Sequence, residues 1–264
     1  MFHATEYIDD SVDDTTLALT VPPPSSTASS ASSVPKRSGN GCSNCPVRAT
    51  CMPETLTPSE LARLDSTICS TRTVRRGESL YRANDTFQSV YAVRLGSFKT
   101  VVMHRDGREQ VTGFNLAGEM LGLDGVHTDR HSCDAIALED SSVCIIPFSV
   151  LEGLCHDMKS MQQHVHRMMS GEIVRESGLM MLLGTMTAEQ RVAAFLLNLS
   201  QRLKTRGYSA AEFNLRMTRE EMGSYLGMKL ETVSRMFSKL HKDELVETHG
   251  KQIRIVNFEG LALI

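Results

Sequence analysis

The segment that most constrains the fold lies near the C-terminus, where "MTREEMGSYLGMKLETVSRMFSKL" predicts two short helices joined by a tight turn. Thr218 and Glu221 have the spacing of a capping box, which starts a helix, and Gly227 suits the left-handed conformation that ends one. A second helix is expected from about Leu230. This order is typical of a helix-turn-helix, whose second helix enters the major groove of DNA.

The second helix carries side chains suited to reading base edges. Glu231, Ser234 and Arg235 stand at i, i+3 and i+4, so they share one face. Arg can bind guanine O6 and N7, and Glu can accept from cytosine N4. An exposed Glu–Arg surface pair is the alternative, and the helix-turn-helix context favours base readout. The following "ELVETHGKQIRIV" predicts a two-stranded wing. Residues expected to contact DNA are Thr218, Glu231, Thr232, Ser234, Arg235 and Lys251.

Two segments of different composition precede this region. "VPPPSSTASSASSVP" is poor in large apolar residues, so residues 1–38 are expected to be a disordered arm. From Ser70 to Phe148, short segments rich in Val, Tyr, Phe and Ile alternate with glycines, which predicts a small β-sandwich or barrel. Asp106-Gly107 marks one hairpin turn within it.

A proline-free segment, residues 149–186, predicts a long helix. Its residues at alternating steps of four and three have coiled-coil spacing, which favours pairing with a second copy of the chain; these are Met169, Ile173, Glu176, Met180 and Leu183. The alternative is that they face the adjacent β domain. In a parallel pair Glu176 approaches its own mate, so like charges weaken the dimer.

Composition excludes several classes of protein. With 41% hydrophobic residues the chain can fill a core, yet it has no apolar run of membrane-spanning length, so a cytoplasmic protein is expected. Residues 187–264 carry twelve Lys and Arg against nine Asp and Glu, a net charge of +3. No nucleophile–base arrangement, P-loop or pair of catalytic carboxylates emerges, so an enzyme is not expected.

Seven cysteines in a reducing compartment indicate metal or redox chemistry rather than disulfides. Three lie close together in "CSNCPVRATC", at Cys42, Cys45 and Cys51. Zinc sites commonly pair two CxxC knuckles, and this segment has one. An iron–sulfur cluster also takes four thiolates and tolerates irregular spacing. The fourth ligand must come from elsewhere, and the candidates are Cys69, Cys133, Cys144 and Cys155.

From about Cys42 onward the chain resembles the FNR branch of the CRP family, the oxygen-responsive regulators named for fumarate and nitrate reduction. The resemblance rests on "CSNCPVRATC", "GFNLAGEMLGLD", "SSVCIIPF", "MMSGEI" and "LGMKLETVSR". It implies an α+β fold: an N-terminal β-roll of the cyclic-nucleotide-binding, jelly-roll type, a long dimerisation helix and a C-terminal winged helix-turn-helix. With the arm at residues 1–38, which lies outside the resemblance, the expected divisions are the iron–sulfur loop and β-roll at 39–148, the dimerisation helix at 149–186 and the winged helix-turn-helix at 187–264.

The resemblance also implies chemistry and partners. It selects Cys144 as the fourth ligand of a [4Fe-4S] cluster that stabilises a homodimer. At low oxygen the dimer would bind palindromic double-stranded DNA with TTGAT-type half-sites, and cluster loss in oxygen would switch binding off. RNA polymerase is the implied partner.

Two other signals remain possible. In nucleotide-binding relatives the glutamate corresponding to Glu119 meets ribose, and an Arg-Ser pair clamps the cyclic phosphate. Here His131-Ser132 replaces that pair, with Arg130 adjacent, so a cyclic-nucleotide-responsive regulator is one alternative. The other is a cluster-free sensor in which Cys42, Cys45 and Cys51 form reversible disulfides.

Overall fold

The structure is a computed structural model that describes residues 41–67, 70–104 and 106–264. The arm expected over residues 1–38, and Cys69, lie outside the described residues. Within the described part, no helix is both long and apolar enough to cross a bilayer.

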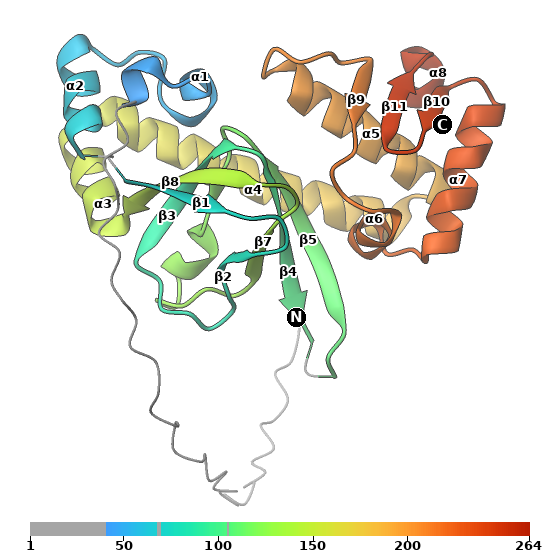
Figure 1. The fold of residues 1–264 in the computed structure, drawn as a ribbon, viewed down its shortest axis with the longest axis horizontal. Coiled ribbons are helices and arrows are strands. Elements are labelled where there is room, and N and C mark those ends of the chain that lie inside the picture. Colours follow the sequence, from blue (N-terminus) through green and yellow to red (C-terminus); the bar gives the residue numbers. More distant parts are fainter. Residues whose placement is uncertain (1–40, 68–69, 105) are drawn as a thin grey trace, which may run out of the picture. The chain divides into compact units, whose positions relative to one another are not determined.

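Eight strands form two four-stranded antiparallel sheets (Figure 1). One sheet has the order β1-β8-β3-β6 and the other β2-β7-β4-β5. The strands are β1 (Ser70–Val74), β2 (Ser79–Tyr81), β3 (Ser89–Leu95), β4 (Ser97–Met103), β5 (Glu109–Leu116), β6 (Met120–Leu121), β7 (Asp134–Ala137) and β8 (Ser141–Pro147). A 3-10 turn, η2 (Leu123–Val126), follows β6. Asp106-Gly107 lies between β4 and β5, as expected.

The inner faces of the two sheets bury one apolar core. Val93, Phe98 and Val143, from β3, β4 and β8, are fully buried in it. Because successive strand residues point to opposite faces, Cys144 packs in a different cluster from its neighbour Val143. The expected β-sandwich is confirmed as a β-roll, and β8 presents Cys144 on the roll's outer side.

A short helical segment precedes the roll. It contains η1 (Cys42–Asn44), α1 (Arg48–Cys51) and α2 (Pro58–Thr67). Thr57 caps α2, because its hydroxyl accepts from the Glu60 backbone N–H at 3.3 Å and its own N–H donates to the Glu60 carboxylate at 2.7 Å.

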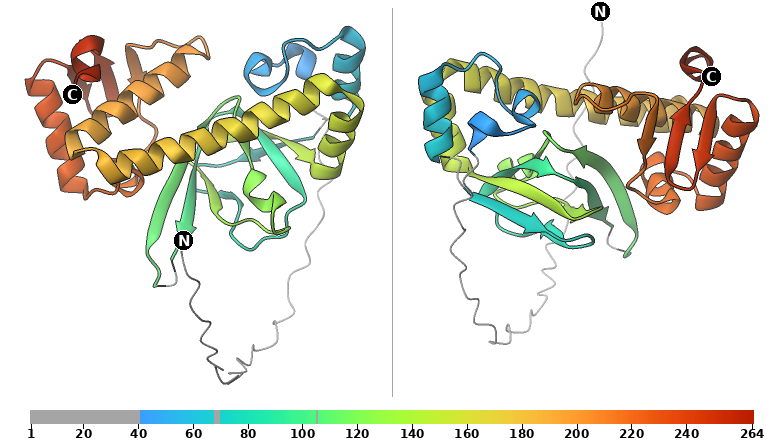
Figure 2. Two further views of the ribbon diagram at one scale, coloured as in Figure 1. Left: turned by 180° about the vertical axis from the view of Figure 1, so that it is seen from behind. Right: turned by 45° about the horizontal axis from the view of Figure 1, so that its top comes forward.

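The long helix expected over 149–186 is divided in two. The chain forms α3 (Phe148–Asp157) and then α4 (Lys159–Thr185), as Figure 2 shows. Between them Met158 has an extended backbone, with φ −127° and ψ 103°, and its side chain is buried. Burial of Met158 in the core therefore breaks the helix where the sequence contains no helix breaker.

The C-terminal part is a winged helix-turn-helix, so the expected fold class is confirmed. Its helices are α5 (Ala188–Lys204), α6 (Arg219–Leu226), α7 (Leu230–Lys242) and α8 (Phe258–Ala262). Strands β9 (Glu212–Asn214), β10 (Val246–His249) and β11 (Gln252–Ile255) form one antiparallel sheet in the order β10-β11-β9. Thr187 begins α5 with a capping box completed by Gln190.

Candidate DNA interface and cysteine site

The turn of the helix-turn-helix has the geometry that its sequence predicts. The Glu221 backbone N–H donates to the Thr218 hydroxyl at 3.1 Å, and the Thr218 N–H donates to the Glu221 carboxylate at 2.7 Å. Gly227 ends α6 with φ +63°, in the left-handed region that favours glycine. Arg191 also donates to the Leu226 carbonyl at 3.0 Å, which ties this turn to α5.

The outer face of α7 carries the expected base-reading residues. Glu231, Ser234 and Arg235 are exposed, whereas Val233 and Leu240 are fully buried on the opposite face. The inner face also includes Phe237, which sequence reasoning missed, while Met236 is half-buried. Three further residues were predicted to contact DNA. Thr218 is exposed at the start of α6 and Lys251 is exposed in the wing, whereas Thr232 on α7 is half-buried.

Sequence reasoning also missed Arg219, the first residue of α6. Its guanidinium lies 3.2 Å from the centre of the Phe237 ring, and its Nη1 is buried with no hydrogen-bond partner among the described residues. Burial lowers the pKa of Arg219 to about 10. The guanidinium places a positive charge beside α7, which favours a polyanion such as DNA near this helix. Its position directly after the N-cap Thr218 was the available signal.

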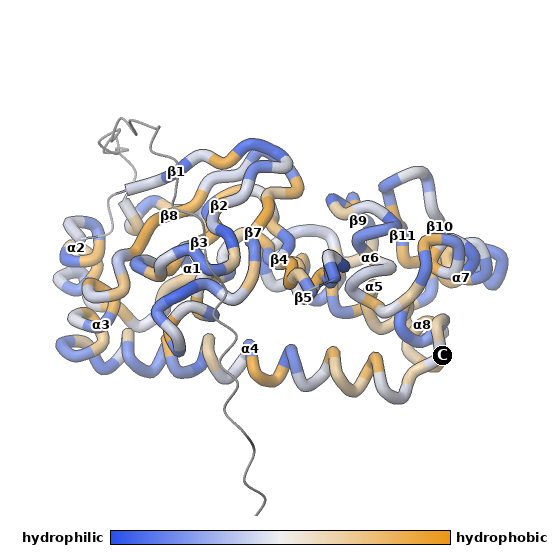
Figure 3. Tube along the Cα trace, turned by 90° about the horizontal axis from the view of Figure 1, so that it is seen from below, coloured by the Kyte–Doolittle hydropathy of each residue, from blue (hydrophilic) through white to orange (hydrophobic). Residues whose placement is uncertain are grey.

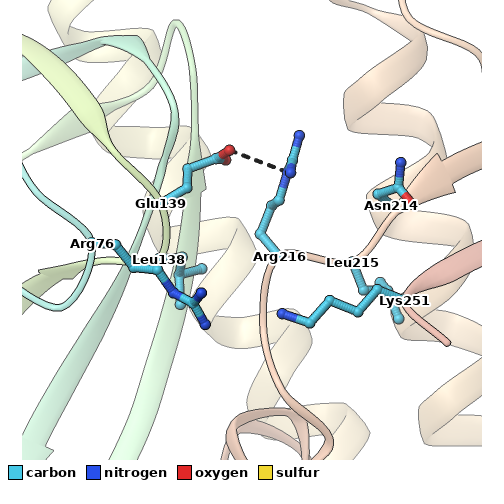
Figure 4. Close-up of a pocket in the computed structure, with 7 residues that line it drawn as sticks. All are labelled: Arg76, Leu138, Glu139, Asn214, Leu215, Arg216 and Lys251. Atoms are coloured by element: carbon cyan, nitrogen blue, oxygen red, sulfur yellow. Dashed lines mark ion pairs between the residues drawn. The ribbon is translucent and has the colours of Figure 1, made fainter.

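Basic residues also gather beside the wing. Arg76, Arg216 and Lys251 line a cavity of about 190 Å³ together with Leu138, Glu139, Asn214 and Leu215 (Figure 4). Arg216 Nε lies 3.2 Å from the Glu139 carboxylate, the one acidic group in this lining. The net charge of the lining is therefore positive, which favours an anionic neighbour.

The three N-terminal cysteines are held by backbone hydrogen bonds within one short segment, residues 42–51, which we call the cysteine loop. Cys45 N–H donates to the Cys42 carbonyl at 3.3 Å, and Cys51 N–H donates to the Val47 carbonyl at 3.2 Å. The cysteine loop packs beside β8, where Cys144 pairs in register with Thr71 of β1 and Ala92 of β3.

Residues from both segments share one apolar cluster. Cys51 is buried in it, and Cys42 and Cys144 are half-buried against it, with Met52, Phe87, Val90, Ile146 and Met161 among its other members. Burial raises the pKa of Cys42 to about 11 and that of Cys51 to about 12. Charge on the neighbouring thiols adds to the rise, because Cys144 and Cys45 both lie close enough to act on them.

The four thiols fit a thiolate-bound cluster in donor chemistry. Burial, and then Cys45, raises the pKa of Cys144, while Arg94 lowers it. No three His, Cys, Asp or Glu residues in the described ranges already stand in ligating geometry. Cys42, Cys51 and Cys144 nevertheless border one apolar cluster, and Cys45 lies between the first two in the cysteine loop, so the four cysteines belong to one part of the fold.

The other described cysteines have different surroundings. Cys133 is buried, and its thiol donates to the Asp124 carboxylate at 3.5 Å. Cys155 lies on α3 and is half-buried against the cluster that contains Cys51. Its pKa is raised by burial and by the nearby Glu152, and the four thiols above do not contribute to that rise. Cys133 and Cys155 are thus set apart electrostatically from those four.

The predicted dimer stripe on α4 is mostly exposed. Apolar residues recur along this helix in Figure 3, and Met169, Ile173 and Met180 expose 40%, 64% and 67% of their surface. Glu176 is exposed between them. Leu183 differs, because it is half-buried against the core of its own chain. Val174 and Met181, beside the stripe, are also exposed. An exposed apolar face of this length favours a helical partner.

Comparisons with known proteins agree with this architecture. Residues 190–264 match the model of the Crp-like helix-turn-helix domain, and residues 71–158 match that of the cyclic nucleotide-binding domain. The transcriptional regulatory protein btr of Bordetella pertussis is 43% identical over 220 residues, covering 83% of this chain and 91% of the relative. The fumarate and nitrate reduction regulatory protein of Yersinia pestis is 41% identical over 221 residues, covering 84% and 88%.

A solved structure gives the same result. FixK2 from Bradyrhizobium japonicum matches with a TM-score of 0.68 and 33% identity, over 74% of this chain and 96% of FixK2. The two curated relatives are regulatory proteins by name, and the prediction of a regulator rather than an enzyme is confirmed. With a β-roll, a long helix and a winged helix-turn-helix in this order, the chain belongs to the CRP/FNR family of DNA-binding transcription regulators.

Proposed function

We propose that this protein is an oxygen-responsive transcription regulator. Cys42, Cys45, Cys51 and Cys144 hold a [4Fe-4S] cluster, and the homodimer binds palindromic DNA with TTGAT-type half-sites at low oxygen. Loss of the cluster in oxygen switches binding off. The observation that carries the proposal is that Cys42 and Cys51 of the cysteine loop and Cys144 of β8 border one apolar cluster.

Burial opposes the thiolate forms of the proposed ligands, and nearby arginines favour them. The raised pKa values of Cys42 and Cys51 keep these thiols protonated at neutral pH, so ligation releases protons to solvent. Arg48 lowers the pKa of Cys42 and Arg94 lowers that of Cys144, so both cations favour the thiolate forms. The apolar lining limits access of water. When bound, the cluster would supply an oxygen-labile iron–sulfide core held by the four thiolates.

A cyclic-nucleotide signal is less well supported. Ser132 donates from its backbone N–H and its hydroxyl to the Asp124 carboxylate, at 2.7 and 3.3 Å. His131 is buried, stacks on Tyr81 with ring centres 3.8 Å apart, and also faces Asp124. A carboxylate thus occupies the donors that would clamp a phosphate, and like charges repel. Glu119, at the ribose position, is engaged by arginines.

The first experiment measures iron and acid-labile sulfide in protein purified without oxygen, together with DNA affinity before and after exposure to air. About four irons per chain are expected, the number in a [4Fe-4S] centre. Air should remove the iron and weaken binding to a TTGAT palindrome. Iron-free protein whose DNA binding follows thiol oxidation or added cyclic AMP would overturn the proposal in favour of one of the two alternatives.

Replacement of Glu176 by alanine should strengthen self-association. In a parallel helix pair the two exposed Glu176 carboxylates repel each other across the seam, and removing them should tighten the dimer about fivefold. Sedimentation of air-exposed, cluster-free protein would measure this change. The control is Glu152→Ala, since Glu152 is exposed on α3, away from the stripe. Unchanged or weaker association of the Glu176 variant would remove this face of α4 from the dimer interface.

A further inference from the structure

Glu119 lies in the turn between β5 and β6, and its carboxylate is the centre of a buried ion cluster. Oε1 accepts hydrogen bonds from Arg202 Nε at 3.0 Å and from Arg206 Nη2 at 2.6 Å. Oε2 accepts from Arg202 Nη2 at 2.6 Å and lies 3.7 Å from Arg175 Nη1. We call these four residues the Glu119 cluster. Its central side chain is only 13% exposed.

The Glu119 cluster joins three parts of the chain. Glu119 belongs to the β-roll, Arg175 to α4, and Arg202 and Arg206 to α5 or its C-terminal end. Both of the latter arginines also bind the backbone, because Arg202 donates to the Phe114 carbonyl in β5 and Arg206 Nε donates to the Ala117 carbonyl of the turn at 2.6 Å. The two arginines therefore bind both the Glu119 side chain and the neighbouring backbone, which fixes the turn more firmly than a single surface ion pair would.

The Glu119 carboxylate is the counter-ion of the buried arginines around it, so its replacement by a neutral side chain would disturb the cluster. Burial alone would raise the pKa of Glu119, but the Arg202 and Arg206 guanidinium groups outweigh it and hold that pKa below its usual value. Arg206 exposes only 8% of its side chain. Removing the carboxylate would leave the buried guanidinium groups without their counter-ion. The groups would then repel one another and move apart, or water would enter to solvate them.

The same turn touches the cysteine loop. Gly118 has φ +87°, and a methyl group built there would collide with the Thr50 side chain. Thr50 is fixed by its hydroxyl, which donates to the Val47 carbonyl at 2.8 Å, and it directly precedes Cys51. The turn is also anchored in the roll, since Gly118 N–H donates to the Val93 carbonyl at 2.7 Å. Residues 117–119 thus contact the cysteine loop on one side and α5 on the other.

We propose that Glu119 is a positioning residue that couples the cysteine loop to the DNA-binding domain, through Gly118 and Thr50 on one side and Arg202 and Arg206 on the other. In this docked arrangement Glu231 and Arg235 stay exposed, so docking leaves the recognition face free for DNA. The coupling holds the DNA-binding domain in the orientation that binds DNA. The signal in this proposal, loss of the cluster, rests on the proposed function. The contact of the turn with Arg202 and Arg206 does not depend on a cluster.

The test uses the full chain with Glu119→Gln, which keeps the shape of the side chain and removes its charge. We expect iron content and dimer fraction to match the wild type, and DNA affinity to fall about tenfold, within the usual range of coupling between sites. Backbone hydrogen exchange around Arg202 and Arg206 should accelerate, while exchange in the core strands of the roll stays unchanged. Glu119→Asp, which keeps the charge, should recover part of the affinity.

Further variants separate coupling from a general loss of stability. Arg206→Gln should weaken DNA binding on its own, yet cost little more when added to Glu119→Gln, because both changes break one interaction. Glu259→Gln, at an exposed position on α8, is the matched control and should behave as wild type. The proposal fails if Glu119→Gln binds DNA as well as or better than wild type, if the two changes add fully, or if local exchange is unaltered. If the wild type lacks iron or does not bind DNA, the proposed function fails, and hydrogen exchange still decides the docking role.

Discussion

Replacement of Cys144 by alanine is expected to abolish iron binding and to lower DNA affinity about 100-fold, near the upper end of measured coupling between sites. Cys144 is the one proposed ligand that lies outside the cysteine loop, so its loss leaves three donors on one short segment and removes the link between that segment and β8. Iron and sulfide assays on anaerobically purified protein, with anisotropy titrations of a TTGAT palindrome, measure both effects.

The matched control is Cys155→Ala. Cys155 is half-buried against the same apolar cluster as Cys51 but is not a proposed ligand, so this change removes a thiol from that cluster without removing a ligand. It should leave iron content and DNA affinity unchanged. Circular dichroism of both variants establishes that the fold is intact. A Cys144 variant that retains iron, or a Cys155 variant that loses it, would show that the fourth ligand had been assigned to the wrong thiol.

Local sequence signals predicted the DNA-binding half well, for a physical reason. The capping box of Thr218 and Glu221 and the left-handed Gly227 act through hydrogen bonds and dihedral angles within a few residues, so their spacing predicts their structure. The division between α3 and α4 was not predictable in this way. Met158 breaks the helix because its side chain is buried among residues from other elements, and no local signal encodes that packing.

The sites show the same contrast. Spacing identified Cys42, Cys45 and Cys51 as a set, because they are neighbours in sequence. The residues alone did not separate Cys144 from the other candidates for the fourth ligand. The strand register and the packing show that Cys144 lies on the outer face of β8, beside the cysteine loop. Glu119 meets Arg202 across 83 residues, and that separation hides the pair from any analysis of local pattern. Long-range ion pairs of this kind require the fold.

Replacement of Arg235 by alanine is expected to weaken binding to the TTGAT palindrome and to erase preference for its guanine. A bidentate contact from Arg to guanine O6 and N7 contributes about 1 to 3 kcal/mol of discrimination, which corresponds to roughly 5- to 150-fold in affinity. Arg235 is exposed on the outer face of α7 and its nearest described partner is the Thr232 hydroxyl, 3.5 Å away, so it is free to turn toward a base. Titrations against the palindrome and against a version with the guanines replaced give the two affinities whose ratio measures discrimination.

Lys251→Ala provides the contrasting variant, because a residue that binds phosphate carries no sequence information. Its loss should weaken binding to both DNA sequences by the same factor and reduce the salt dependence by about one released counterion. For Arg235→Ala the two affinities should instead converge. If the Arg235 variant keeps the wild-type ratio while binding more weakly overall, Arg235 contacts phosphate, and base readout must pass to Glu231 and Ser234 on the same face of α7.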